Sequence, residues 1–310
     1  MKKILVTGAT GMVGRNIIEG EKSENYVFFT PNSLQLDLLN RNIVDKYIAE
    51  VKPDIIIHCA GLVGGIQANI ANPVDFLVKN TQMGINVIMS AFDSDVKEFI
   101  NMSSSCVYPK DARNPLTEDL ILNGKLEPTN EGYALAKITA TKLCQYINSQ
   151  DLTCHYKTVI PCNLYGKYDK FNTSFSHMLP AVIKKVHEAK YNGQDYIDIW
   201  GDGSARREFM YVEDLADFIY FALENFEKMP ENINVGIGHD YSINEYYSMV
   251  ASIVGFKGHF LNDLLKPTGM KQKLMDNSKQ KEFGWAHKTT LREGVQKAYN
   301  YYLNEILNDK

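Results

Sequence analysis

Gly8-Ala9-Thr10-Gly11-Met12-Val13-Gly14 follows the apolar run Ile4-Leu5-Val6 and opens a stretch with helical spacing. The order of strand, tight glycine turn and helix is typical of a phosphate-binding turn, because glycine lets the backbone approach a diphosphate and the helix start offers free N–H groups. The spacing is GxxGxxG, which differs from the GxGxxG of two-domain dehydrogenases. A tight turn alone also needs glycine, but the position between strand and helix favours a dinucleotide site.

Units of strand and helix recur along the first half of the chain. Runs of apolar and β-branched residues predict strands, and apolar spacings of three and four predict helices. Strands that alternate with helices form a parallel, doubly wound α/β sheet of the Rossmann type. The expected strands are 4–6, 26–29, 54–59, 98–102 and 156–160, and the expected helices are 43–51, 80–92 and 132–146, with 128–131 leading into the last.

The pattern becomes less regular from about residue 164, which indicates a smaller second region. A strand is expected over 208–212, and helices over 178–186, 215–223 and 243–254. We expect residues 1–163 to form a dinucleotide-binding Rossmann domain and residues 164–310 to form mainly a substrate domain. Since no linker separates the two parts, the segment from about 208 to 240 is expected to return to the first domain.

The composition excludes several classes of function. The 310 residues contain 33 Lys and Arg against 37 Asp and Glu, a net charge of -4, so no basic footprint for nucleic acid or an anionic membrane is present. No apolar run approaches the ~20 residues of a membrane span, and no signal peptide is visible. Five cysteines without CxxC spacing argue against disulfides and zinc. We expect a reduced, cytoplasmic protein that binds no metal, no nucleic acid and no membrane.

Tyr133 and Lys137 lie four residues apart in an expected helix, which places the phenol and the ammonium on one face. A tyrosine with its usual pKa near 10 is a poor acid–base catalyst at neutral pH, and a neighbouring cation stabilises its phenolate. In a chain with 18 tyrosines, the same spacing also fits a half-buried Tyr beside an exposed Lys. The pair is therefore a hypothesis for catalysis.

Ser104 and Cys106 follow the expected strand 98–102, at the sheet edge where doubly wound folds bind ligands. Residues i and i+2 of a strand share a face, so we expect the hydroxyl and the thiol to point the same way. The hydroxyl could hydrogen-bond a substrate carbonyl. The alternative interpretation is a polar strand end with a small, buried cysteine.

Several stretches, taken in order, resemble the extended short-chain dehydrogenase/reductases: GATGMVG (8–14), SSSCVYP (103–109), YALAK (133–137), IPCNLYG (160–166) and RREFMYVED (206–214). HCAGLVGGIQANIANPVDF (58–76), PTNEGYALAKI (128–138), SFSHMLPAVI (174–183) and KPTGMKQKLMD (266–276) closely resemble the GDP-L-fucose synthase subfamily of 3,5-epimerase/4-reductases. Members of that subfamily are homodimers that use NADPH. The resemblance implies a Rossmann domain, a smaller C-terminal nucleotide-sugar domain and a GDP-linked keto-sugar as substrate.

The resemblance also implies two catalytic groups. Ser104, Tyr133 and Lys137 would form the reductase triad: Tyr133 would protonate the C4 oxygen as hydride arrives, Ser104 would hold that oxygen, and Lys137 would bind the nicotinamide ribose and favour the phenolate. Cys106 and His177 would be the acid–base pair of epimerisation, as a thiolate and an imidazolium on opposite faces of the sugar. Both residues are present, which permits epimerisation without proving it.

Two sets of binding residues follow from the same resemblance. The glycine turn and two later segments would hold the cofactor, while an indole and a guanidinium in the second half suit stacking and diphosphate binding. The cofactor set is Gly8, Thr10, Gly11, Met12, Val13, Gly14, Asp37, Leu38, Ala60, Tyr133 and Lys137, and the substrate set is Asn163, His177, Lys185, Trp200, Arg207 and Lys273.

Two features depart from the family pattern. Arginines often neutralise the 2′-phosphate of NADPH at places where this chain has Thr10 and Pro31-Asn32-Ser33. No Asp or Glu ends the second strand either, so the usual NAD marker is missing. NADP(H) stays favoured and NAD(H) stays open, with Asn32, Ser33 or Arg15 as candidate phosphate contacts. At Lys185 the family pattern has arginine, whose bidentate geometry lysine lacks.

Other functions were weighed against a reductase. Nucleotide-sugar 4,6-dehydratases carry Asp-Glu where this chain has Cys106-Val107, which disfavours dehydration. A UDP-hexose 4-epimerase with bound NAD turns over without added reductant, and a non-catalytic dinucleotide-binding scaffold has no need of Ser104, Tyr133 and Lys137 together. We predict an NAD(P)H-dependent C4-keto reductase of a GDP-4-keto sugar. The sequence leaves open whether the sugar is a 6-deoxyhexose or a heptose, and whether 3,5-epimerisation occurs.

Overall fold

Neighbouring residues of the first strand, β1 (Lys2–Thr7), are buried on opposite sides of a sheet. The computed structural model describes residues 1–171, 177–266 and 269–307. Val6 belongs to an apolar cluster with Phe218, whereas Leu5 belongs to another cluster with Val87. A strand that is apolar on both faces needs helices on both sides, which is the arrangement of a doubly wound sheet.

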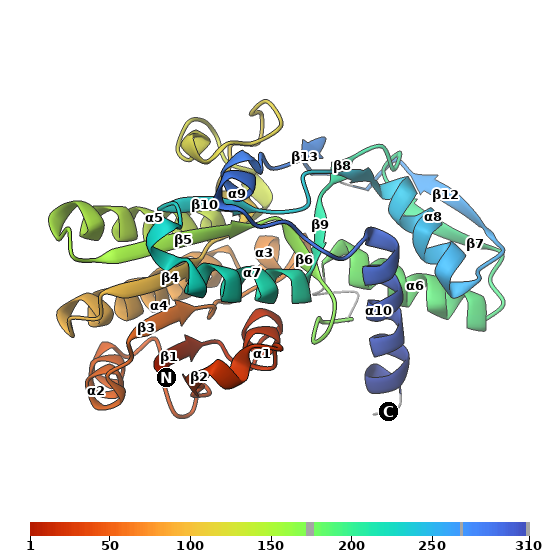
Figure 1. Cartoon of the computed structure of the whole chain (residues 1–310). Coiled ribbons are helices and arrows are strands. Elements are labelled where there is room, and N and C mark those ends of the chain that lie inside the picture. Colours follow the sequence, from red (N-terminus) through yellow and green to blue (C-terminus); the bar gives the residue numbers. More distant parts are fainter. Residues whose placement is uncertain (172–176, 267–268, 308–310) are drawn as a thin grey trace.

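The central sheet has six parallel strands in the order β10-β5-β4-β3-β1-β2 (Figure 1), which confirms the predicted α/β fold class. Because all strands run the same way, their carboxyl ends share one edge, where ligands bind in such folds. The remaining strands of this sheet are β2 (Tyr26–Phe29), β3 (Ile55–His58), β4 (Glu98–Met102), β5 (His155–Pro161) and β10 (Asn232–Val235).

Two layers of helices cover this sheet. On one side α4 packs against α2 and α5, and on the other side α1 packs against α7. The helices are α1 (Met12–Ile18), α2 (Arg41–Val51), α4 (Pro73–Asp93), α5 (Glu131–Gln150) and α7 (Val212–Glu224), with the short α3 (Ile66–Ala71) before α4 and α9 (Ser278–Phe283) beside β10.

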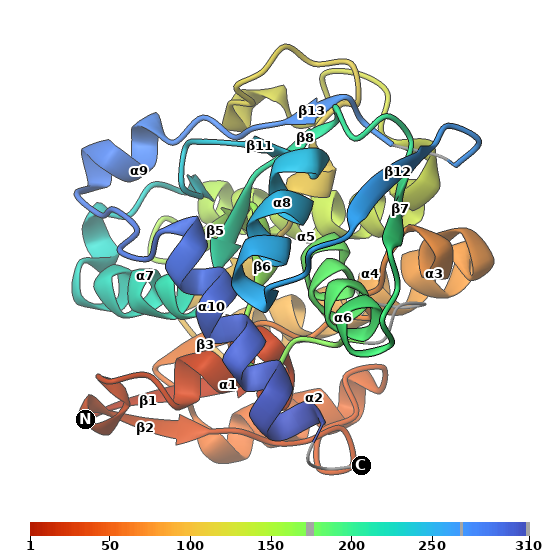
Figure 2. The same cartoon turned by 90° about the vertical axis from the view of Figure 1, so that its right-hand side faces the viewer.

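The second lobe lies on the right of Figure 1 and has its own apolar core. In Figure 2, α8 lies between α10 and the strand pair formed by β7 and β12. Its helices are α6 (Met178–Tyr191), α8 (Ile243–Val254) and α10 (Leu291–Tyr301). β7 (Tyr196–Trp200) and β12 (His259–Asp263) form a two-stranded sheet inside this lobe. Two other small sheets lie between the lobes (Figure 1): β6 (Asn163–Tyr165) with β9 (Phe209–Tyr211), and β8 (Arg206–Arg207) with β11 (Tyr241–Ser242) and β13 (Gln272–Lys273).

The expected elements agree with the structure best where the pattern is strongest. β2, β4 and α8 have the expected bounds, whereas α4 begins at Pro73 because proline is tolerated in a first helical turn. The helices α3, α9 and α10 and the strands β7, β10 and β12 were not predicted. In the described part of the chain, no helix is both long and apolar enough to cross a membrane.

Candidate functional site

The glycine turn packs backbone against backbone too closely for a side chain at Gly8 or Gly14. A Cβ on Gly8, whose φ is +70°, would lie 2.6 Å from the Ala60 nitrogen, and a Cβ on Gly14 would lie 2.4 Å from the Gly8 oxygen. Gly11 caps α1 without a side-chain hydrogen bond, so the first N–H groups of the helix stay available. This cradle fits the diphosphate of a dinucleotide. Thr10 is exposed beside it, and Met12 and Val13 form the first helical residues.

The residues expected at the far end of the cofactor are held by local contacts. Asp37 Oδ1 accepts a hydrogen bond from the Leu39 nitrogen at 3.0 Å, and Asn86 Nδ2 donates to the Leu38 oxygen at 2.8 Å. Asn32 Oδ1 accepts from the nitrogens of Leu34 and Gln35. These bonds order the loop between β2 and α2.

The third candidate for a phosphate contact, Arg15, also has intramolecular partners. Its guanidinium lies 3.5 Å from the centroid of the Tyr168 ring and pairs with Glu19. Recognition of a 2′-phosphate by Asn32, Ser33 or Arg15 therefore stays a prediction.

The three residues of the expected triad converge at the carboxyl end of β4. Tyr133 and Ser104 are hydrogen-bonded, and Lys137 Nζ donates to the Met102 oxygen at 2.8 Å. The Lys137 ammonium lies 5.8 Å from the centroid of the Tyr133 ring. The helical spacing thus places both side chains at the end of β4, beside the loop that Ser104 begins.

The pKa of Tyr133 moves opposite to our expectation. Burial raises it, the neighbouring Cys106 adds to the rise, and the bond to Ser104 lowers it in part. Burial also lowers the pKa of Lys137 to about 8. In the free chain burial dominates the pKa of Tyr133, and the Lys137 ammonium is bonded to the Met102 oxygen. The expected effect of Lys137 on the phenolate stays a prediction. A protonated phenol is the form that can donate a proton to a substrate oxygen.

Ser104 and Cys106 do not share a strand face, which corrects a second expectation. β4 ends at Met102, and Ser105–Val107 form a 3₁₀ turn capped by Ser104. The Cys106 nitrogen donates to Ser104 Oγ at 3.3 Å. The turn, rather than strand periodicity, brings the hydroxyl and the thiol together.

Cys106 is the meeting point of three segments. Asn130 Nδ2 donates to its sulfur at 3.1 Å, and Lys273 Nζ of β13 donates at 4.0 Å. The charge of Lys273 also acts on His177: burial lowers the pKa of this imidazole, and Lys273 and Lys170 lower it further. The two predicted epimerisation residues thus both lie near Lys273. The free chain favours a neutral His177 over the expected imidazolium.

The expected substrate residues fall into two groups. Arg207 lies beside Lys273 in the register of β8 and β13, and burial lowers its pKa while Glu127 opposes the change. Asn163 Nδ2 donates to the Glu208 oxygen at 2.9 Å. Lys273, which neighbours Arg207, links this group to the Cys106 sulfur and to the His177 imidazole.

The second group lies further out, on α6 and β7. Lys185 Nζ pairs with Asp198 Oδ1 at 2.9 Å and donates to the Asp198 carbonyl at 2.6 Å. Trp200, two residues later, is 41% exposed and has the Lys266 ammonium 5.7 Å from its ring centroid. No described contact joins Lys185 or Trp200 to the first group.

Two residues of the site were not predicted from the sequence. Asn130 stands in the quoted stretch PTNEGYALAKI, three positions before Tyr133, yet only its contact with Cys106 reveals its place. Glu208 is 1% exposed, and its carboxylate accepts hydrogen bonds from the Gly238 nitrogen at 2.8 Å and the Met275 nitrogen at 3.0 Å. Since Met275 follows β13, Glu208 anchors the segment that carries Lys273.

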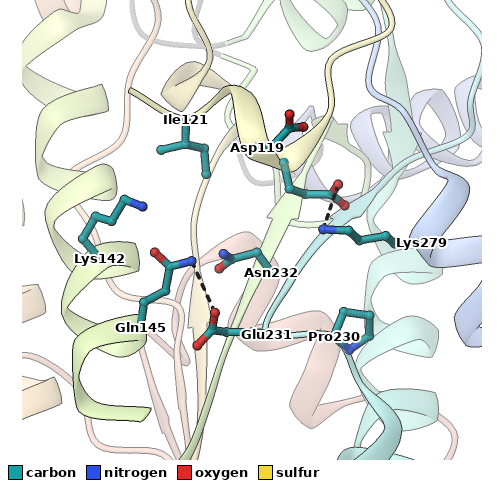
Figure 3. Close-up of a pocket in the computed structure, with 9 residues that line it drawn as sticks. Asp119, Ile121, Lys142, Gln145, Pro230, Glu231, Asn232 and Lys279 are labelled. Atoms are coloured by element: carbon teal, nitrogen blue, oxygen red, sulfur yellow. Dashed lines mark hydrogen bonds and ion pairs between the residues drawn. The ribbon is translucent and has the colours of Figure 1, made fainter. Parts of the chain in front are cut away.

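A separate pocket of about 320 Å³ lies beside the amino end of β10 and contains none of the predicted site residues (Figure 3). Lys142 and Gln145 of α5 face Asn232 across it, and Gln145 is hydrogen-bonded to Glu231. Acidic and basic side chains alternate around it, and Lys279 pairs with Glu118. Over residues 1–171, 177–266 and 269–307, no group of three His, Cys, Asp or Glu side chains could hold a metal ion.

Two known proteins are similar in sequence to this chain over nearly its whole length. The GDP-L-colitose synthase of Yersinia pseudotuberculosis is 58% identical over 99% of this chain and all of its own length. The GDP-L-fucose synthase of Azorhizobium caulinodans is 48% identical over 98% of both chains.

A solved structure and a family match complete the comparison. A GDP-mannoheptose C4 reductase from Campylobacter jejuni with NADP bound superposes with a TM-score of 0.88, at 31% identity and 98% coverage of both chains. Residues 4–236 match the NAD dependent epimerase/dehydratase family. Together with the glycine cradle and the Ser104, Tyr133 and Lys137 cluster, these matches establish that the chain belongs to the NAD dependent epimerase/dehydratase family.

Proposed function

We propose that this chain inverts a carbon next to the C4 ketone of a GDP-linked 4-keto-6-deoxyhexose and then reduces that ketone. The chain is an NADP(H)-dependent reductase of a GDP-4-keto sugar. The observation that carries the finer proposal is the contact of Cys106 with Lys273 next to the Ser104–Tyr133 bond. One site thus holds groups for both chemistries.

Reduction uses the side chains at the end of β4. The glycine cradle and Ala60 would hold the dinucleotide, which supplies the hydride to C4. Ser104 holds the ketone oxygen, and Tyr133 donates its proton to that oxygen. Because the pKa of Tyr133 is raised, the phenol stays protonated at neutral pH. Lys137 is anchored on the Met102 carbonyl, where its ammonium can orient a ribose hydroxyl.

Epimerisation uses Cys106 and His177. A proton on a carbon next to a ketone is acidic because the resulting charge spreads onto the ketone oxygen, which Ser104 and Tyr133 hold. One of the two residues accepts that proton while the other returns a proton to the opposite face of the carbon. When Cys106 carries the charge, Asn130 and Lys273 donate to its sulfur.

Colitose is a 6-deoxyhexose that also lacks the hydroxyl on C3. Because the chain is 58% identical to a GDP-L-colitose synthase, our first choice of substrate is the GDP-4-keto-6-deoxyhexose without a C3 hydroxyl, called the 3-deoxy sugar below. A 3-deoxy sugar has no stereocentre at C3, so only C5 can be inverted. The test is to incubate the pure protein with GDP-4-keto-6-deoxy-mannose, its 3-deoxy analogue and its heptose analogue, each with NADPH, and to identify the products by NMR.

We expect the 3-deoxy substrate to give the highest kcat/KM. A preference for the heptose would overturn the hexose assignment. In deuterated water without NADPH, deuterium should enter C5, and Cys106→Ser should suppress this exchange while sparing the reduction of a sugar that is already inverted. Wild-type protein that reduces without exchange is a reductase only.

A homodimer would cover an apolar face of α4 and α5. A groove of about 400 Å³ on this face is lined by Ile85, Met89, Ile138, Thr139, Lys142, Leu143 and Tyr146. Tyr146 is 65% exposed, and burying such surface against a second copy stabilises association. Sedimentation should give a dimer that Ile85→Asp converts to a monomer, while Leu152→Asp, outside the groove, leaves it intact. A monomeric wild type would contradict the proposal.

We retain the division into a Rossmann domain, residues 1–163, and a substrate domain, residues 164–310, as a proposal. The pairing of β10 with β5 supports a return of the segment 208–240 to the first domain. A cytoplasmic location is supported by the five free cysteines. Limited proteolysis should cut the chain between the lobes before it cuts within the central sheet.

A further inference from the structure

Asn130 has one satisfied and one unsatisfied end. Its Nδ2 donates to the Cys106 sulfur at 3.1 Å, whereas its Oδ1 is fully buried and accepts from no described residue. A buried acceptor without a donor has lost its hydrogen bonds to water without replacement, so such atoms normally have a partner in the working state of a protein. The missing donor therefore points to a group that arrives with a ligand.

The helix that follows does not explain the residue. Asn130 precedes α5 at the capping position, yet its side chain accepts no hydrogen bond from the helix. By contrast, Asn40 caps α2 in the ordinary way, since its Oδ1 accepts from the Ile43 nitrogen. Asn130 therefore does not cap α5, and its amide nitrogen donates to Cys106 instead.

The place of the unsatisfied oxygen limits what can donate to it. The two amide atoms share one carbon, so Oδ1 lies close to the Cys106 sulfur, and a ring hydroxyl of a sugar bound against that sulfur comes within reach of Oδ1. Tyr133, three residues along the chain, is hydrogen-bonded to Ser104, and the proposed mechanism places the C4 oxygen beside these two hydroxyls. A hydroxyl is the donor that a sugar presents there.

We propose that Asn130 is a specificity-determining residue, whose Nδ2 holds the Cys106 sulfur while its Oδ1 accepts a hydrogen bond from a ring hydroxyl of the sugar. This inference rests on the proposed function and adds a residue that reads the sugar. One rigid amide then sets the position of the sugar relative to the sulfur, so that a sugar without a matching hydroxyl is not held against the base.

Binding tests the acceptor end without any turnover. Titration calorimetry with GDP, GDP-L-fucose and GDP-L-colitose, at saturating NADP⁺, compares the wild type with Asn130→Ala. The variant should weaken sugar binding about three- to tenfold, the range of one neutral hydrogen bond, and leave GDP binding unchanged. Because the favoured 3-deoxy sugar has no hydroxyl on C3, we expect the binding of both sugars to weaken, which assigns the hydroxyl on C2. Weakening of GDP-L-fucose alone assigns the hydroxyl on C3 and contradicts the choice of the 3-deoxy substrate. Unchanged sugar binding, or equal weakening of GDP, overturns the inference.

Asn130→Asp tests the donor end. This variant keeps an acceptor oxygen but places no N–H on the sulfur, so sugar binding should stay within threefold while deuterium exchange at C5 falls at least about tenfold. If exchange and reduction fall in the same proportion, the residue has only a structural role and the inference is wrong.

Asn40→Ala is the matched control, because it removes a true helix cap away from the site and should lower thermal stability without changing either readout. The two proposals fail separately. A wild type that neither reduces nor exchanges any GDP-keto sugar contradicts the proposed function, whereas an active wild type with an indifferent Asn130→Ala contradicts only this inference.

Discussion

The two catalytic groups of the site are built in different ways. Ser104 lies in the turn after β4, and Tyr133 and Lys137 lie one helical turn apart on α5, which packs against that turn and against β4. Cys106 depends on Lys273, which lies 167 positions away along the chain, and on His177 at the start of α6. The comparison indicates that the reductase group belongs to one folding unit, whereas the epimerase group exists only when the two lobes are assembled.

The largest effect should come from within the first group. Tyr133→Phe removes the phenol proton, and loss of a general acid typically costs 10²–10⁴-fold in rate, so reduction should fall at least about a hundredfold. The affinity for NADP⁺ should change little, because binding of the dinucleotide does not need this proton. Deuterium exchange at C5 should fall less than reduction, because Ser104 still holds the ketone oxygen on which the charge develops. Steady-state assays and NMR measure the two halves separately, and near-normal reduction would remove Tyr133 from its assigned role.

The choice between NADPH and NADH should affect only reduction, the chemistry of Ser104, Tyr133 and Lys137. With Thr10 and Pro31-Asn32-Ser33 at the places of the usual arginines, we predict a preference for NADPH over NADH below about a hundredfold, less than two charged contacts of about 1.5–3 kcal/mol each would give. Dissociation constants for both dinucleotides decide this. A preference of about a thousandfold would reveal a basic residue that reads the phosphate.

Glu208→Gln should act on the second group. The carboxylate accepts from both Gly238 and Met275, and an amide can accept with only one of its two atoms, so one anchor of the β13 segment is lost. We expect exchange at C5 to fall about tenfold and reduction of an already inverted sugar to stay within threefold. The sharper control is Asp276→Asn, next to the anchor but outside it. Equal loss of both activities would show that the lobes do not separate the two chemistries.

The smallest effect concerns the stability of the segment around Asp169, which follows β6. Asp169 has a buried Oδ2 without a partner, and burial raises its pKa to about 7. Because the folded pKa lies above the unfolded value, its stabilising contribution is present at pH 4 and is lost as the pH rises through about 7. Asp169→Asn should therefore be more stable than the wild type at pH 8, by about 1 kcal/mol, with little difference at pH 5.5. Urea unfolding at both pH values measures this, and an equal effect at the two would contradict the assignment.

The sequence predicted those features that depend on neighbours in the chain. The α/β class follows from apolar runs, and the pairing of Tyr133 with Lys137 follows from helical spacing. Two expectations failed. The chain leaves β4 before Ser104, so Cys106 lies in a turn and not on a strand face. At Tyr133, burial raised the pKa of the phenol despite the nearby cation.

Other features needed information that no window of the sequence carries. The contact of Lys273 with Cys106 and the anchoring of β13 by Glu208 join segments far apart, and their spacing has no signature. The helix α10 is a different case, since Thr290 and Glu293 form a capping box that an S/T-x-x-E search would have found. Most predicted binding residues were placed through resemblance, and their roles stay predictions until ligands are measured.

The position of β10 at the edge of the central sheet has a consequence for the synthesis of the protein on the ribosome. β5 is complete when residue 161 has left the ribosome, but its partner spans Asn232–Val235. During that interval one edge of the seven-residue strand β5 has unpaired N–H and C=O groups, the kind of surface that pairs with other chains. A chain terminated before β10 would keep that edge open, so the second half of the sequence also protects the first half from aggregation.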